Sequence, residues 1–127
     1  MDRERALPIV LRVTGALFVF APALGFLLLP AEFRWAPHHP PYERMIVALY
    51  VALGLCLWRA AADPRRHVLL LDFVILSSVL HGGVMLYDSF AQQGEHAHLW
   101  GDVPLLFVVA AVFWWLRPSG AAAQQAT

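Results

Sequence analysis

Four long apolar segments, separated by short polar connections, dominate the pattern of hydrophobic and polar positions along the chain. They cover residues 7–29, 42–61, 68–87 and 99–116. A helix that crosses a bilayer needs roughly 20 mostly apolar residues, so each segment is long enough to form one span. The pattern predicts an all-α fold, a four-helix transmembrane bundle that forms a single integral membrane domain over residues 1–127.

The composition supports a membrane setting and weighs against other classes. The chain of 127 residues is 60% hydrophobic and 14% charged, with a mean hydropathy of +0.61, whereas a soluble domain is nearer half apolar and one-quarter charged. Nine arginines balance nine acidic residues and there is no lysine, so the charge gives no sign of a nucleic-acid partner. The single cysteine, Cys56, excludes an internal disulfide.

The distribution of arginine predicts how the spans are oriented. Six arginines lie before the first segment, around the second connection or after the last segment: Arg3, Arg5, Arg59, Arg65, Arg66 and Arg117. Because cytoplasmic connections carry the excess of basic residues, we expect both termini and the turn at 62–67 to face the cytoplasm. A cleaved signal peptide is the alternative for the first segment, but its apolar stretch is long and contains Arg12, which favours a retained helix.

Aromatic and small residues refine this prediction. The five tryptophans lie near segment ends, where an interfacial belt would place them: Trp35, Trp58, Trp100, Trp114 and Trp115. Pairs of small residues four positions apart allow helices to approach closely in lipid: Ala21 with Gly25, Ala48 with Ala52, and Ser78 with Gly82. These faces permit a homo-oligomer or a membrane-protein partner but do not require one.

Ionisable side chains inside apolar segments are costly in a bilayer, so each needs a partner or a function. Arg12 in the first segment and Asp72 in the third lie toward the cytoplasmic end, where they are candidates for a structural ion pair. Separate roles are the alternative. Arg12 would then extend to the headgroups, and Asp72 would stabilise the start of its helix through the helix dipole.

A second group of ionisable residues comes from three segments and is predicted at similar depth near the outer leaflet. Its members are Glu43, His81, His98 and Asp102, with Tyr50, Ser77, Ser78 and His96 as secondary candidates on the same helical faces or beside them. Imidazole and carboxylate groups hold transition metals or transfer protons. The group therefore predicts a buried ligand or metal site, and a transition metal or, by analogy, a haem is a candidate cofactor.

The segment Gly-Asp-Val-Pro at 101–104 also has a purely structural interpretation. Asp102 can cap a helix that begins at Val103, with Pro104 in its first turn. A helix that begins at about His98 is the alternative, and Pro104 would then bend it. Both alternatives bring Asp102 to the membrane edge near His98.

Three stretches, YERMIVALYVALG (42–54), SSVLHGGVM (77–85) and HLWGDVP (98–104), together resemble a family of small bacterial four-helix membrane proteins with a domain of unknown function. The resemblance covers nearly the whole chain. It implies a multi-pass protein of the bacterial cytoplasmic (inner) membrane, and it places Glu43, His81, His98, Gly101 and Asp102 in the recognisable stretches. The general plan also looks like the DoxX-like membrane proteins, some of which are linked to quinone or thiol redox systems, although this chain lacks a cysteine pair.

Three hypotheses for function follow. The first is a non-catalytic or accessory membrane protein that binds a metal or small ligand at the outer site. The second is a DoxX-like membrane oxidoreductase subunit that uses quinone or haem. The third is a structural subunit of a membrane complex, in which the polar residues satisfy one another.

Overall fold

The computed structural model describes residues 2–28, 40–92 and 95–118, and it confirms the all-α fold class in this part of the chain, which contains no strand. Four α-helices and two short 3-10 helices follow in the order α1 (Arg3–Leu28), α2 (Pro40–Ala60), η2 (Pro64–His67), α3 (Val68–Ala91), η3 (Glu95–Trp100) and α4 (Asp102–Leu116). They correspond in position to the four segments predicted from the sequence.

Three of the described helical segments are long and apolar enough to cross a membrane: Arg3–Pro22, Pro64–Ala91 and His98–Leu116. The protein is therefore a helical, multi-pass membrane protein, as the hydropathy pattern predicts. α2 has 21 residues, and its crossing stays a prediction, as does the orientation of the spans. α4 begins at Asp102 rather than near residue 99, because η3 and the turn at Gly101 precede it.

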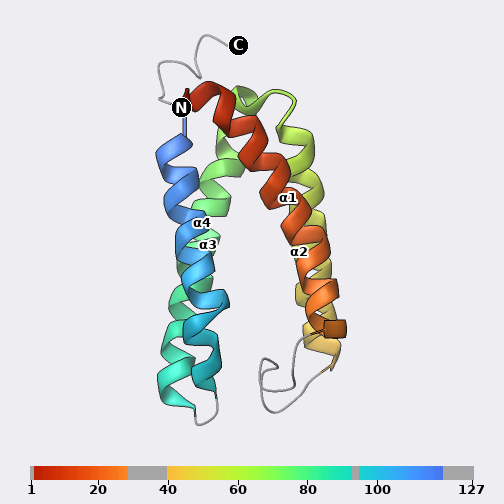
Figure 1. Ribbon diagram of the computed structural model, residues 1–127, viewed down its shortest axis with the longest axis vertical. Helices are drawn as coiled ribbons and strands as arrows, with labels where there is room; N and C mark the ends of the chain where they lie inside the picture. Colours follow the sequence, from red (N-terminus) through yellow and green to blue (C-terminus); the bar gives the residue numbers. More distant parts are fainter. Residues whose placement is uncertain (1, 29–39, 93–94, 119–127) are drawn as a thin grey trace. The chain divides into compact units, whose positions relative to one another are not determined.

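The helices divide into two compact units, one built on α1 and α2 and the other on α3 and α4. Each unit is described by itself. The organisation as a single domain stays a prediction. Within each unit the two helices lie side by side and run antiparallel (Figure 1).

The α1–α2 unit is held by a close approach of two helix backbones. A β-carbon at Gly15 would lie 2.7 Å from the carbonyl oxygen of Gly54, and one at Gly54 would lie 2.6 Å from the carbonyl oxygen of Gly15. Only glycine, which has no β-carbon, lets the two backbones come this close. The small-residue pattern does not predict this contact, and the expected face of α2, Ala48 with Ala52, is exposed.

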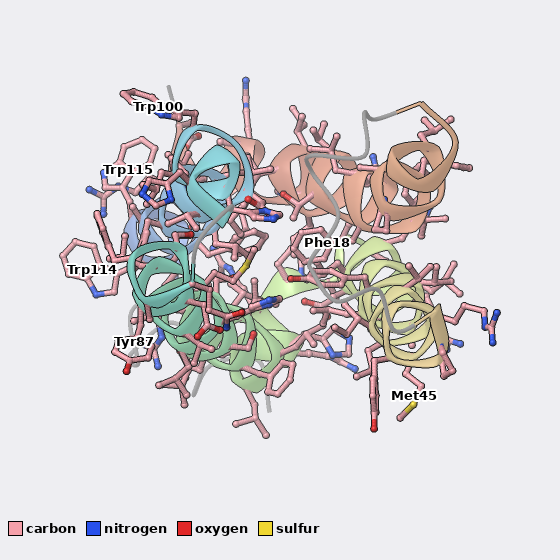
Figure 2. All side chains as sticks on the ribbon, turned by 90° about the horizontal axis from the view of Figure 1, so that it is seen from below. Phe18, Met45, Tyr87, Trp100, Trp114 and Trp115 are labelled. Atoms are coloured by element: carbon pink, nitrogen blue, oxygen red, sulfur yellow. The ribbon has the colours of Figure 1, made fainter. Side chains whose placement is uncertain are left out.

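Side chains on either side of this glycine contact complete the α1–α2 unit. The rings of Phe18 and Tyr50 meet edge to face, with centroids 5.1 Å apart and an interplanar angle of 85° (Figure 2). At the start of α1, Glu4 forms an ion pair with Arg65 of η2. This contact ties the turn that follows α2 to the beginning of α1.

The α3–α4 unit is packed through side chains. The buried face of α3 carries residues spaced three or four apart, as an amphipathic helix requires: Leu71, Val74, Ser78, Gly82, Met85 and Ser89. Met85 forms a small core with Val103 and Leu106 of α4. A β-carbon at Gly82 would lie 3.2 Å from the ring of Phe107, so the predicted contact face at Ser78 and Gly82 is confirmed.

Large aromatic side chains cover the outer surface of the α3–α4 unit. Trp100, at the end of η3, is 90% exposed, and Trp114 and Trp115, at the end of α4, are also exposed. All three point away from the helices, as does Tyr87 of α3 (Figure 2). Their position at both ends of α4 agrees with the interfacial belt expected from the sequence. Trp35 lies outside the described residues.

Candidate functional site

The candidate site centres on a buried histidine at the start of the last membrane-spanning segment. His98, in η3, is 1% exposed and is one of the largest fully buried side chains of the described structure. Its Nδ1 atom lies 2.9 Å from Oδ2 and 3.0 Å from Oδ1 of Asp102. The Asp102 side chain is 43% exposed. The pair thus joins an imidazole in the interior to a carboxylate that reaches solvent.

This geometry fixes the chemistry of the imidazole ring. A carboxylate accepts hydrogen bonds, so Nδ1 of His98 donates its proton to Asp102. When the ring is neutral, its lone pair then lies on Nε2. That atom is buried as well. His98 therefore presents a hydrogen-bond acceptor, or a metal ligand, inside the protein.

Local backbone structure explains why these two side chains meet. The amide of Gly101 donates a hydrogen bond to the carbonyl oxygen of His98, and the amide of Leu105 donates one to the carbonyl oxygen of Gly101. Pro104 lies in the first turn of α4, where its missing amide proton leaves no helical bond unmade. The chain turns at Gly101 and brings residues 98 and 102 onto one side.

The structure revises both interpretations of the Gly-Asp-Val-Pro segment. Asp102 is the first residue of α4, so the helix starts one residue before Val103 and well after His98. Both carboxylate oxygens of Asp102 lie against the His98 ring. The carboxylate also sits at the positive end of the helix dipole, which stabilises its charge.

His81 belongs to the same unit as His98 and Asp102. It lies on α3 next to Gly82, which packs on Leu106 and Phe107 of α4, and its side chain is half-buried. Three of the four predicted site residues, His81, His98 and Asp102, therefore lie in the same unit, and His98 and Asp102 are in direct contact.

The secondary candidate residues lie in different environments. Ser78 is buried, and Ser77 is half-buried with its hydroxyl donating to the carbonyl oxygen of Val74 at 3.2 Å. His96 is exposed, although it is only two residues from His98. Tyr50 packs on Phe18 in the α1–α2 unit.

Glu43 lies in α2, but its side chain is outside the described structure, so its part in the site stays a prediction. The same holds for the ion pair between Arg12 and Asp72, because these residues belong to different units. Arg12 is exposed on α1, and Asp72 is half-buried on α3.

A buried polar residue that the sequence pattern did not single out lies on the face of α3 that carries Ser78 and Gly82. Ser89 is fully buried, and its hydroxyl donates a hydrogen bond to the carbonyl oxygen of Met85 at 2.8 Å. The spacing from Ser78 and Gly82 through Met85 to Ser89 continues one helical face, which is the signal that could have revealed it.

The described residues contain no group of three or more His, Cys, Asp or Glu side chains that could hold a metal ion. Both carboxylate oxygens of Asp102 lie within 3.0 Å of Nδ1 of His98. Within the described part of the chain, a metal on His98 would have Asp102 as the orienting partner of its ligand rather than as a second ligand.

Comparison with protein families gives a match over residues 3–126 to a family of unknown function, DUF6632. The chain belongs to this family. The match covers the whole described structure except Asp2, so both helix pairs and the His98–Asp102 pair are parts of the family domain. No curated protein matches the chain, and no solved structure matches it. The likeness to DoxX-like proteins and a bacterial origin stay predictions.

Proposed function

We propose that this protein is an accessory membrane protein that binds a small ligand through His98. The observation that carries the proposal is the buried imidazole whose Nδ1 is held 2.9 Å from a carboxylate oxygen of Asp102. A ring held in one tautomer by a carboxylate is suited to recognising one kind of partner.

The chemistry of Nε2 indicates the class of ligand. With its proton on Nδ1, neutral His98 accepts a hydrogen bond at Nε2. A small molecule with a hydroxyl or amine group could donate a hydrogen bond to this atom, and the charge of Asp102 would strengthen the bond by polarising the ring.

A transition metal is a second candidate, because a histidine that donates its other ring proton to a carboxylate is the common arrangement of metal-bound histidine. The described residues contain no group of three or more His, Cys, Asp or Glu side chains that could hold a metal ion. We therefore favour the hydrogen-bonded ligand and use metal content as the measurement that separates the two.

The proposal is tested on protein purified in mild detergent, by metal analysis, an absorption spectrum and native mass spectrometry of bound small molecules. His98→Ala removes the binding atom, and Asp102→Asn removes the charge that orients it. His96→Ala is the matched control, because this exposed histidine lies two residues away on the same segment. We expect a stoichiometric bound molecule in the parent and His96→Ala proteins, weaker retention in Asp102→Asn, and none in His98→Ala.

Other outcomes of these measurements would favour a different function. Stoichiometric metal that disappears in His98→Ala would replace the organic ligand by a metal. A visible spectrum that changes on reduction would favour the oxidoreductase hypothesis with quinone or haem. No ligand in any variant, together with lower thermal stability of His98→Ala and Asp102→Asn, would assign the pair a structural role.

A further inference from the structure

The glycine contact between α1 and α2 shows which part of α2 lies beside Arg12, an arginine that the sequence places inside a membrane span. Gly15 lies against Gly54, Leu57 and Trp58, and the helices run antiparallel. Arg12 is three residues from Gly15 toward the start of α1. Arg59 is one to five residues from these contacts toward the end of α2. At a rise of 1.5 Å per residue, Arg12 and Arg59 lie at the same level to within one helical turn.

This level is the end of α2, which finishes at Ala60. Arg12 is therefore next to the polar turn that follows α2. Its aliphatic stem can run along the apolar helix while the guanidinium reaches the headgroup region. Both arginines are exposed, so their charged groups are open to lipid and solvent on the α1–α2 unit.

Some of the arginines near this end of the α1–α2 unit have recorded carboxylate partners. Arg65 pairs with Glu4, Arg66 pairs with Asp63 at 2.9 Å, and Arg5 lies 4.0 Å from Asp2. These three carboxylates are thus committed to other arginines. Among the described residues of the α1–α2 unit, the structure records no carboxylate next to Arg12 or Arg59.

We propose that Arg12 and Arg59 bind the phosphate groups of anionic phospholipids at this end of the protein. Guanidinium groups bind phosphate oxygens through two parallel hydrogen bonds, a geometry that an ammonium group cannot reproduce. Exposed apolar side chains lie near this level on the same helices, among them Val13, Leu55 and Trp58. An apolar helix surface with a phosphate-binding group at its edge fits a lipid, whose acyl chains and headgroup lie in the same order.

This site is separate from the His98 site, so the two proposals stand or fall independently. The test uses full-length protein in detergent, with added phosphatidylglycerol and phosphatidylcholine of the same chain length, and bound lipid is counted by native mass spectrometry. The test variant is Arg12→Gln with Arg59→Gln. The control is Arg65→Gln with Arg66→Gln, which removes the same charge from arginines that already have carboxylate partners.

We expect the parent to prefer phosphatidylglycerol. Each unpaired arginine near a headgroup contributes about fivefold in apparent affinity, so the test variant should bind phosphatidylglycerol about 25-fold more weakly. Its affinity for phosphatidylcholine should be unchanged. The control variant should lose clearly less affinity than the test variant.

Equal losses in the test and control variants would overturn the proposal, because they would show a general effect of net charge. A parent without preference for the anionic lipid would overturn it as well, and so would inorganic phosphate that competes as well as the lipid does. If the double variant does not fold, as judged by circular dichroism, the single variants decide. Each should lose about fivefold, and unchanged affinity in both contradicts the site.

Discussion

The two helix pairs of this protein are held together by different means. α1 and α2 meet backbone to backbone at Gly15 and Gly54, whereas α3 and α4 meet through side chains such as Met85, Val103 and Leu106. The first contact leaves no room for a functional group. The unit of α3 and α4 also contains the buried His98 and its carboxylate partner.

The comparison shows how a short membrane protein can separate packing from chemistry. In lipid, helices associate through close contact of small residues, and polar side chains are costly unless they are paired. The α1–α2 unit is held at its centre by close contact of small residues, and its ion pairs lie at the helix ends. The α3–α4 unit contains a buried imidazole paired with a partly exposed carboxylate, and a ligand-binding role would account for its cost.

The largest effect should come from the glycine contact. Gly54→Ala places a methyl group 2.6 Å from a backbone carbonyl oxygen of α1, so the helices must move apart. Overpacking of this kind costs up to about 3 kcal/mol in free energy of unfolding. The measurement is unfolding in detergent followed by circular dichroism. Ala52→Val, at an exposed site on the same helix, is the control. An equal loss of stability there would show that the effect does not come from the glycine contact.

An intermediate effect is expected at the polar pair. His98→Ala removes a fully buried ring and its hydrogen bond, which should cost about 2 kcal/mol in free energy of unfolding. Asp102→Asn should cost less, because this side chain is partly exposed. A double-mutant cycle measures the coupling between the two residues. Strict additivity of the two losses would show that the contact between them does not contribute to stability.

The smallest effect should come from the same substitution made in the other helix pair. Gly82→Ala meets the Phe107 ring at 3.2 Å, and this ring is a partly exposed side chain that can turn away. We expect a loss below about 1 kcal/mol in free energy of unfolding. Gly83→Ala, where nothing lies within 4 Å, is the control. A loss at Gly82 as large as that at Gly54 would mean that α3 and α4 are packed as rigidly as α1 and α2.

Hydropathy predicts the helices and most of the spans, because the period and length of apolar segments depend on local sequence alone. It does not predict the Gly15–Gly54 contact. A glycine contact depends on which faces of two helices meet, and a sequence pattern such as Ala48 with Ala52 is equally suited to a contact that does not form. Hydropathy also predicts the last span, which is confirmed as His98–Leu116, but not that a 3-10 helix and a turn at Gly101 precede α4.

The candidate site could be predicted in part. Depth and spacing are sufficient to bring His98 and Asp102 together, since four residues separate them at the start of one span. The difference between His96 and His98 could not be predicted, because both flank the same alanine and only the packing of η3 buries one of them. Glu43 and Tyr50 belong to a different unit from His98, and a helical pattern contains no information on the distance between units.

The exposed tryptophans of α4 have a consequence for the bilayer itself. Trp100 and Trp114 are 14 positions apart, which corresponds to a rise of about 21 Å along a helix. The hydrocarbon layer of an ordinary membrane is about 30 Å thick, so aromatic rings anchored at both interfaces create a hydrophobic mismatch. Lipid next to α4 can match it by thinning locally, at a cost that grows with bilayer thickness. The protein should therefore partition into thinner regions of a membrane and avoid thicker ones.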